Sequence, residues 1–262
     1  MTAVIQTAIT IGGAGLACGG LLALAAKFLA VEEDPRVEEV NEILPGANCG
    51  GCAYAGCAAY AEAIVLEGAA INLCAPGGAE ILNKLAEATG QTAQQAEHKV
   101  AIVLCGGEVE HAPRKFDYNG VADCQAAHST GGGDKACTYG CLGYASCARA
   151  CPVGAIEIIN GIAKVHPDLC ISCQACVKTC PRKLIKMVPY ARKIHVMCSS
   201  KDKGPAVKKA CTVGCIGCTI CTKLAEDEAI KMEGFLAVVD YDKDLDNDTV
   251  IEKCPPNCIV RI

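Results

Sequence analysis

The chain contains a short run of cysteines whose spacing is that of an iron–sulfur ligand set. The run reads C-x2-C-x2-C-x3-C-P and comprises Cys170, Cys173, Cys176, Cys180 and Pro181. Bacterial proteins use this run to hold a [4Fe-4S] cluster with the first three cysteines, while the fourth cysteine ligates a neighbouring cluster. A short loop of this kind directs three thiolates at one cubane, and the Cys-Pro pair leads the chain away. The run therefore predicts two clusters close together.

A second Cys-Pro pair upstream predicts how the two clusters exchange ligands. Cys147 and Cys151 are separated by three residues, and Pro152 follows. We expect Cys151 to complete the cluster of the first three cysteines in the downstream run, and Cys180 to complete the cluster that includes Cys147. Zinc is the alternative, because it also binds C-x2-C pairs. Zinc sites rarely show three cysteines at two-residue gaps closed by Cys-Pro, so the spacing favours iron–sulfur clusters.

The composition agrees with metal sites in a reducing compartment. The chain has 262 residues, of which 22 are Cys, 3 are Phe and none is Trp. Cysteine this dense indicates disulfides in a secreted chain and metal sites in a cytosolic one, and the ferredoxin spacing favours metal. Because ligation and folding are coupled, bound clusters would supply much of the folding free energy. The net charge of −5 argues against a nucleic-acid partner.

An uncharged segment precedes the cysteine motifs. Residues 2–26 carry no charged side chain, and at ~1.5 Å per residue a helix of this length spans roughly 37 Å, enough for a ~30 Å hydrocarbon core. A signal peptide is the alternative, but its basic start is missing and no cleavable extracellular domain follows. We expect residues 1–30 to be a transmembrane anchor in the inner (cytoplasmic) membrane. Clusters need a reducing side, so the rest of the chain should be cytoplasmic, and Lys27 agrees with the positive-inside rule.

A separate group of four cysteines follows a charged segment, residues 32–45, that we expect to be a linker. The group has the spacing C-x2-C-x4-C-x16-C and comprises Cys49, Cys52, Cys57 and Cys74. The backbone can pass close to an inorganic core at three glycines, which are Gly50, Gly51 and Gly56. Residues 58–68 and 79–97 are predicted to be helical. This pattern resembles the small four-cysteine iron–sulfur domain of electron-transfer subunits and corrinoid iron–sulfur proteins, and predicts a [4Fe-4S] domain over residues 31–97.

The remainder of the chain contains an internal repeat. The segment KAC-TYGC-LGYASC is matched 74 residues later by KAC-TVGC-IGCTIC, and their cysteines are Cys137, Cys141 and Cys147, then Cys211, Cys215 and Cys221. KVAIVLC, which ends at Cys105, is echoed by KIHVMC, which ends at Cys198. A repeat this regular implies two ferredoxin-like units in tandem, which we place at residues 98–190 and 191–262.

The whole chain is therefore predicted to be of the α+β class. It would consist of one N-terminal transmembrane helix, the small four-cysteine domain and the two ferredoxin-like units. Short strands that should pair around the clusters are predicted at residues 156–159, 162–165 and 236–240.

The two copies of the repeat differ at one ligand position. In the second unit a complete C-x2-C-x2-C is formed by Cys215, Cys218 and Cys221. In the first unit Tyr144 stands where Cys218 stands. We expect Cys137 to supply the missing thiolate, with Cys105 or Cys124 as the alternatives. The predicted set for this cluster is Cys137, Cys141, Cys147 and Cys180.

The second unit is predicted to hold one cluster. Cys254, which precedes Pro255, should complete its set. A companion cluster would need four further cysteines, at positions occupied by Ala225, Asp244, Asn247 and Val250. The predicted total is four clusters, or about 16 Fe at four irons per cluster. Apart from Cys18 in the N-terminal segment, five cysteines are left without a role, although a further cluster built from some of the first four is an alternative: Cys105, Cys124, Cys198, Cys211 and Cys258.

Other side chains give no sign of independent catalysis. The five His residues form no two-His motif, and no nucleotide-binding, flavin-binding or hydrolase motif is found. A small basic stretch, residues 201–209, is either a solvated face or a docking site for an acidic ferredoxin. We expect the chain to conduct electrons and its partners to complete the chemistry.

Taken in order, these motifs resemble the B subunit of the Rnf-type membrane complex. The resemblance covers the entire chain: the N-terminal span, GANCGGCAYAGC, the ferredoxin unit from YGCLGYASCARACP to CISCQACVKTCP, and KDKG, GCIGC and CP near the end. It implies the long form of this subunit, with a second ferredoxin-like unit. It also implies a subunit of a translocase that accepts electrons from reduced ferredoxin and passes them to the flavin, NAD-binding and membrane subunits.

The residues alone leave two other functions open. One is a ferredoxin-like electron-transfer subunit of a membrane hydrogenase or molybdenum oxidoreductase. The other is a metal-binding scaffold without redox turnover. Neither the terminal acceptor nor the transported ion follows from the sequence.

Overall fold

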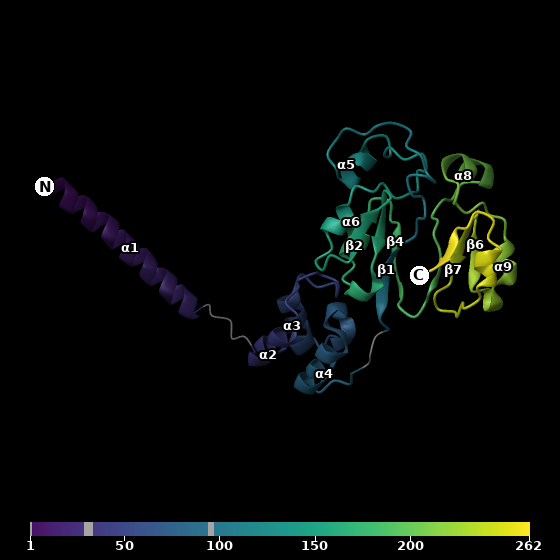
Figure 1. Cartoon of the computed structure of the whole chain (residues 1–262). Helices are drawn as coiled ribbons and strands as arrows, with labels where there is room; N and C mark the ends of the chain where they lie inside the picture. The colour runs from purple at the N-terminus through teal and green to yellow at the C-terminus, as the bar shows by residue number, and fades with distance from the viewer. Residues whose placement is uncertain (1, 29–33, 94–96) are drawn as a thin grey trace.

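The computed structural model describes residues 2–28, 34–93 and 97–262. The chain begins with helix α1 (Thr2–Phe28), continues through a small helical domain and ends in two successive α+β units (Figure 1). Within the described part of the chain, no helix is both long and apolar enough to cross a membrane. The predicted anchor, residues 1–30, includes residues 1, 29 and 30, which lie outside the described residues.

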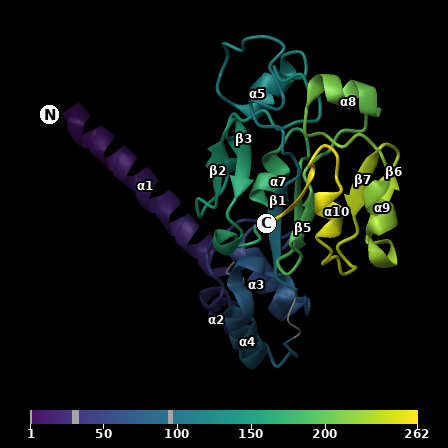
Figure 2. The ribbon, with the colours of Figure 1, turned by 45° about the vertical axis from the view of Figure 1, so that its right-hand side comes forward.

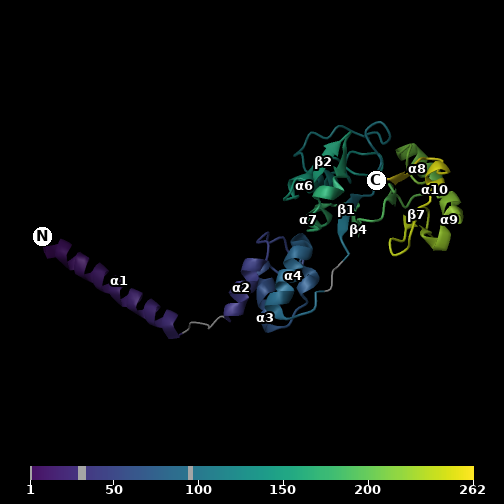
Figure 3. The same cartoon turned by 60° about the horizontal axis from the view of Figure 1, so that its bottom comes forward.

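The small domain is built from three short helices (Figure 3). They are α2 (Pro35–Ile43), α3 (Cys57–Leu66) and α4 (Gly78–Thr89), with single 3-10 turns at Ile71–Leu73 and Ala75–Gly77. The helices bury a common apolar core whose largest members are Val40, Leu44, Tyr60, Ile64, Ile71, Leu82 and Leu85. The predicted helices over residues 58–68 and 79–97 correspond to α3 and α4, and α4 ends eight residues before the predicted limit.

Helix α2 corrects the prediction of a linker over residues 32–45. Asp34 caps its N-terminus by accepting a hydrogen bond from the backbone N–H of Arg36 at 3.0 Å, and Pro35 occupies the first helical turn, where its missing N–H costs nothing. Val40 on this helix is 1% exposed because it packs against the other two helices. The charged composition thus reflects the solvated face of a packed helix.

The two α+β units have the same topology. In the first unit, two antiparallel pairs form between β1 (Lys99–Val103) and β4 (Ile185–Pro189) and between β2 (Ile156–Ile159) and β3 (Ile162–Val165). In the second, they form between β5 (Ile194–Val196) and β8 (Ile259–Arg261) and between β6 (Ile230–Glu233) and β7 (Leu236–Val239). In each unit, then, the first and last strands pair, and the middle two form a hairpin. Figure 2 shows the two hairpins, β2–β3 and β6–β7.

The helices of the two units also correspond. The first unit contains α5 (Cys124–Ser129), α6 (Ser146–Arg149) and α7 (Ala175–Thr179), and the second contains α8 (Gly204–Ala210), α9 (Ile220–Leu224) and α10 (Thr249–Glu252). Helices α6 and α9 precede the hairpins, and α7 and α10 precede the last strands. The predicted strands at 156–159 and 162–165 are confirmed, and that at 236–240 is one residue longer than β7.

Three cysteine-bearing loops, which precede α6, α7 and α9, share one backbone conformation. Each has two residues in the left-handed region, separated by one residue. The first of each pair is Gly143 (φ 78°), Ser172 (φ 59°) or Gly217 (φ 70°), and the second is Ala145 (φ 61°), Gln174 (φ 60°) or Thr219 (φ 62°). Repeated curvature of this kind turns successive thiols toward one side of each loop.

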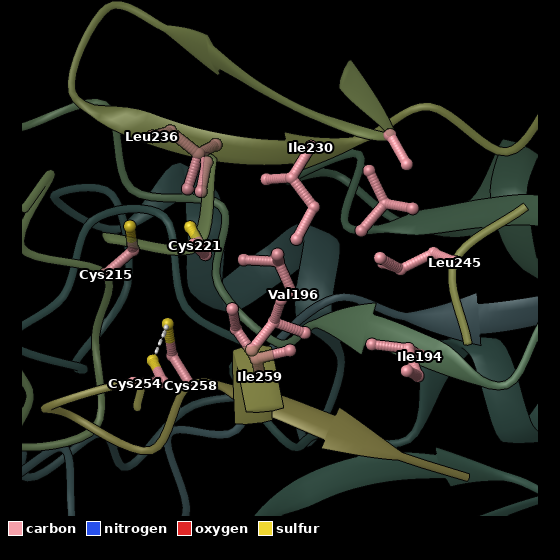
Figure 4. Packing of buried hydrophobic residues seen from close by; sticks show 14 residues of the cluster. Ile194, Val196, Cys215, Cys221, Ile230, Leu236, Leu245, Cys254, Cys258 and Ile259 are labelled. Carbon is pink, nitrogen blue, oxygen red and sulfur yellow. Dashed lines mark hydrogen bonds between the residues drawn. The ribbon is translucent and has the colours of Figure 1, made fainter. Parts of the chain in front are cut away.

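The apolar core of the second unit packs directly beside a group of thiols. Ile194, Val196, Ile230 and Ile259 interdigitate at its centre and are 1–3% exposed. Figure 4 shows Cys215, Cys221, Cys254 and Cys258 gathered at one edge of this core. The strands therefore place apolar residues inside and thiols at one end.

Replacing Gly217 by alanine is expected to destabilise this arrangement strongly. Gly217 has φ +70°, and an added Cβ would lie 2.9 Å from the carbonyl oxygen of Phe235. The matched control is Gly234→Ala, because Gly234 has φ +64° but open space around the added Cβ. We expect Gly234→Ala to lower the free energy of unfolding by roughly 1–2 kcal/mol, and Gly217→Ala by roughly 3 kcal/mol or more, since backbone must also move. Anaerobic guanidinium titration of the visible absorption measures both, and equal midpoints would contradict the prediction.

Candidate iron–sulfur sites

All 22 cysteines are free thiols, and all except Cys18 lie in the small domain or the two α+β units. Among the residues that the structure describes, no three Cys, His, Asp or Glu side chains are close enough to share a single metal ion. A [4Fe-4S] cubane is larger than one ion, and each of its four thiolates binds a different iron, so its sulfur ligands surround it instead of meeting at one point.

The first group of thiols lies in the small domain, as the sequence predicts. Burial raises the pKa of Cys74, and the neighbouring thiols of Cys57, Cys49 and Cys52 raise it further. Cys57 is held at the start of α3, where its backbone N–H donates to Asn48 Oδ1 at 2.8 Å. The four predicted ligands of this domain are thus brought together.

Tyr60 fixes the position of Cys74 relative to α3. Tyr60 is 1% exposed. Its hydroxyl donates a hydrogen bond to the carbonyl of Ala70 at 2.6 Å and accepts one from the N–H of Leu73 at 3.2 Å. Both bonds tie the segment before Cys74 to the helix that begins at Cys57. A buried hydroxyl with two partners is a stable anchor, so a cysteine 17 positions away in sequence still meets the other three.

The second group lies in the first α+β unit and gathers thiols from both cysteine runs. Burial raises the pKa of Cys176 to about 11, with further contributions from Cys170, Cys173 and Cys151. Cys151 comes from the loop after α6, whereas the other three come from the loop before α7 and its start. The structure therefore places the thiol from the upstream Cys-Pro pair beside the downstream run.

The third group differs from the predicted set at one position. A single pocket is lined by Cys124, Cys141, Cys147 and Cys180. Burial raises the pKa of Cys147 to about 12, and Cys141, Cys124 and Cys180 raise it further. Cys137, which we expected in this set, lines a different pocket with Cys105, Cys198 and Cys211. Cys124 thus takes the place predicted for Cys137.

Polar contacts hold Cys124 in this position. Its backbone N–H donates to Ser146 Oγ at 2.7 Å, and that hydroxyl donates to Asp123 Oδ2 at 2.6 Å. Asp123 also caps α5 and pairs with Arg149 at 3.1 Å. Helix α5, which begins at Cys124, is thereby attached to α6, which carries Cys147.

The sequence contains a signal that favours Cys124 over Cys137, which is an insertion in the first unit. Cys105 and Cys137 lie 32 positions apart, whereas Cys198 and Cys211 lie 13 apart, so the first unit is 19 residues longer here. The longer segment contains Cys124, and only the first unit lacks a cysteine at the position of Tyr144. An extra cysteine in an insertion, together with a missing one in the motif, indicates a replacement.

The fourth group lies in the second unit. Burial raises the pKa of Cys221 to about 11, and Cys215, Cys218 and Cys254 raise it further. These are the four residues that the sequence predicts for this site. A fifth thiol, Cys258, lines the same pocket, with its sulfur 3.6 Å from that of Cys254.

Cys258 shares a hydrogen bond with Cys254, in which either thiol can be the donor. Hydrogen bonding with Cys258 lowers the pKa values of Cys215 and Cys254 to about 6, and the same two contacts raise the pKa of Cys258. A lowered pKa favours the thiolate form of Cys215 and Cys254, which is the form that binds iron.

Variants of Cys254 and Cys258 should separate a proposed ligand from a neighbouring thiol that is not one. We expect Cys254→Ser to lower the iron content by about four per chain, because Cys254 precedes Pro255 as Cys180 precedes Pro181. The matched control Cys258→Ser should keep its iron, because Cys258 lies outside the four proposed ligands. Iron analysis of anaerobically reconstituted proteins measures both. Unchanged iron in Cys254→Ser, or a loss confined to Cys258→Ser, would contradict this assignment.

Comparisons with known proteins identify iron–sulfur domains in this chain. A family model described as "Putative Fe-S cluster" matches residues 44–76, and one described as "4Fe-4S binding domain" matches residues 163–186. The B subunit of an ion-translocating oxidoreductase complex from Methanosarcina acetivorans is 42% identical over 97% of this chain and 97% of its own length. The B subunit of a proton-translocating ferredoxin:NAD(+) oxidoreductase complex from Clostridium ljungdahlii is 43% identical, over 100% and 94%. The corresponding subunit of a Na(+)-translocating complex from Acetobacterium woodii is 44% identical, over 99% and 78%.

The α+β fold and its four-thiol groups define an iron–sulfur protein of the multi-cluster ferredoxin class. The identities over the full length of the chain also define its family. The chain belongs to the family of B subunits of Rnf-type, ion-translocating ferredoxin:NAD oxidoreductase complexes, and it is an iron–sulfur, electron-transport subunit of such a membrane complex.

Proposed function

We propose that this chain accepts electrons from reduced ferredoxin and conducts them along [4Fe-4S] clusters to the flavin, NAD-binding and membrane subunits of its complex. The observation that carries the proposal is that the two thiol groups of the first α+β unit adjoin each other, and one of them adjoins the thiol group of the small domain. Four thiol sets take part in the proposed ligation: Cys49, Cys52, Cys57 and Cys74; Cys151, Cys170, Cys173 and Cys176; Cys124, Cys141, Cys147 and Cys180; and Cys215, Cys218, Cys221 and Cys254.

The small domain touches the first unit at its thiols. Lys178 Nζ donates to the carbonyl of Gly50 at 3.2 Å. A Cβ added at Gly51 would lie 3.3 Å from the carbonyl oxygen of Cys173 and 3.5 Å from the sulfur of Cys49. The absence of a side chain at Gly51 thus lets two cysteine-bearing loops meet, which supports electron transfer between the first two sets.

Within the first unit, the second and third sets are also neighbours. Cys176 belongs to one set and Cys147 to the other, and Cys176 is among the thiols that raise the pKa of Cys147, after burial and the members of its own set. Helices α6 and α7, which carry these residues, pack against each other. The arrangement supports a direct path from the third set through the second to the small domain.

The thiol environments fit [4Fe-4S] clusters. Each set supplies four sulfur ligands, and backbone N–H groups donate to several of the sulfurs: from Ala155 to Cys151 at 3.3 Å, from Ala163 to Cys141 at 3.4 Å, and from Ala101 to Cys170 at 3.5 Å. Such bonds stabilise the negative charge on thiolates and tune the reduction potential. When bound, a [4Fe-4S] cluster supplies one-electron transfer, which is the chemistry that this conduit needs.

The proposal includes a single membrane anchor at the N-terminus, with the thiol-bearing domains on the cytoplasmic side. Residues 2–26 lack charged side chains, and the described leucines of α1 are exposed: Leu16, Leu21, Leu22 and Leu24. A group of exposed leucines on one helix forms an apolar surface that is unfavourable in water. Lipid would cover this surface favourably. Assembly of the relatives in ion-translocating complexes supports the same location.

Removal of residues 1–27 combined with a redox titration tests both parts of the proposal. Cys49 is the first proposed ligand along the chain, so we expect the truncated chain to be soluble, brown and still reducible. A potentiometric EPR titration should show signals of reduced [4Fe-4S] clusters at low potential. A non-redox scaffold would retain iron without such signals. Loss of all visible absorption on truncation would contradict independent anchor and cluster domains.

A further inference from the structure

Four thiols outside the proposed sets line one pocket where the two α+β units meet. Two come from each unit, at equivalent positions of the repeat. Cys105 and Cys198 follow the first strands, β1 and β5, and Cys137 and Cys211 lie four residues before Cys141 and Cys215. The internal repeat thus supplies two pairs of thiols, and the packing of the units brings the pairs together.

The four thiols are close neighbours. Burial raises the pKa of Cys211, and Cys105 and Cys137 raise it further. Burial also raises the pKa of Cys198 to about 11, and Cys137 is among its contributing neighbours. A Cβ added at Gly107 would lie 3.5 Å from the sulfur of Cys211 and 3.6 Å from that of Cys105. Gly107 therefore leaves room that a side chain would take from the pocket.

Equivalent backbone groups donate to the equivalent sulfurs. The N–H of Cys141 donates to the sulfur of Cys105 at 3.3 Å. In the second unit, the N–H of Cys215 donates to the sulfur of Cys198. Each of these donors belongs to a residue of an adjoining thiol set, so the pocket lies between the third set, in the first unit, and the fourth set, in the second.

Two cations lie close to thiols of this pocket. The ammonium of Lys135, whose side chain is 4% exposed overall, donates to the carbonyl of Gly107 at 2.5 Å, and its charge lowers the pKa of Cys211. The guanidinium of Arg182 donates to the carbonyl of Cys137 at 2.8 Å. Among the described residues neither cation forms an ion pair with a carboxylate. A buried ammonium without an anionic partner is costly, and four thiolates would provide the missing negative charge.

We propose that Cys105, Cys137, Cys198 and Cys211 bind a further [4Fe-4S] cluster across the boundary between the two units. The proposal rests on the cluster-bearing role proposed above and extends it. The site would link the fourth set to the third, and so connect the second unit to the path that ends in the small domain. It raises the expected content from the four clusters predicted from sequence to five, or about 20 Fe per chain.

Single and double cysteine variants of the full chain test this site. Anaerobically reconstituted wild-type protein should contain about 20 Fe, all as [4Fe-4S] in its Mössbauer spectrum. Cys105→Ser and Cys198→Ser should each lose about four Fe, and the double variant should lose the same four, not eight. Because these cysteines belong to different units, only a shared site gives that non-additive loss. Cys18→Ser, far from every pocket thiol in sequence, is the matched control and should keep all its iron.

Other outcomes would overturn the proposal in distinguishable ways. A wild-type content of about 16 Fe, with or without one zinc, would refute a cluster at this site while leaving the other four in place. Additive losses in the double variant would refute a shared site. A wild-type chain that binds no cluster at all would refute the proposed function itself. A variant that misfolds can also lose iron from other sites. In that case the iron content of the wild-type chain, about 20 Fe or about 16 Fe, still decides whether the further cluster exists.

Discussion

The Cys124→Ser protein is expected to lose one cluster, about four Fe, and Tyr144→Cys in the same chain is expected to restore it. The structure places Cys124 with Cys141, Cys147 and Cys180. Tyr144 occupies the position that Cys218 holds in the second unit. The loops around these two positions have matching left-handed residues on either side, so a thiol at position 144 would point where that of Cys218 points.

The restoring substitution has a close control. Tyr144 donates a hydrogen bond to Asp134 at 2.8 Å, and any replacement that lacks the hydroxyl removes this bond. Cys124→Ser combined with Tyr144→Phe loses the hydroxyl without gaining a thiol, and it should stay about four Fe short. Iron analysis and EPR of the reduced proteins measure the cluster directly. Full iron in Cys124→Ser would show that Cys124 is not a ligand.

The Cys176→Ser protein is expected to lose the second cluster and to isolate the small domain from the rest of the chain. Cys176 is a neighbour of Cys147 and of Cys173, and the loop of Cys173 touches Gly51 in the small domain. The iron content should fall by about four, while the set of Cys49 survives because the small domain has its own buried core.

Electron transfer should respond more strongly than iron content to this substitution. Freeze-quenched EPR after mixing with a reductant should show the remaining clusters of the two α+β units reduced before that of the small domain, whereas in the wild type they should be reduced together. The Cys258→Ser protein is the matched control for loss of a buried thiol outside the proposed sets. Loss of both clusters in Cys176→Ser would show that the small domain does not bind its cluster independently.

Local motifs made much of this protein predictable from sequence. The run from Cys170 to Cys180 carries its geometry in two- and three-residue gaps, so spacing alone anticipates which thiols meet there. The strands at 156–159 and 162–165 were predictable for the same reason, because two short apolar segments flank Asn160 and Gly161, a pair that favours a hairpin. The tandem repeat likewise indicated two units of one topology.

Contacts made over long sequence distances could not be predicted in this way. Cys124 joins its set only because an insertion folds α5 back onto α6, through Ser146 and Asp123, and no spacing rule describes an insertion. Cys105 and Cys198 meet because two separate units pack together, which the repeat implies but does not position. The charges of α2 favour a linker in the sequence, because only one apolar residue of this helix, Val40, is buried.

Reduction of the truncated chain by ferredoxin is the most direct test of its proposed role. Chemically reduced ferredoxin, mixed anaerobically with residues 28–262, should bleach the visible absorption of the chain and produce the EPR signals of reduced [4Fe-4S] clusters. If the basic stretch at residues 201–209 contributes to docking, the rate should fall as salt rises, because screening weakens attraction between exposed charges. Clusters that dithionite reduces but ferredoxin leaves oxidised would contradict a role as the electron entry of the complex.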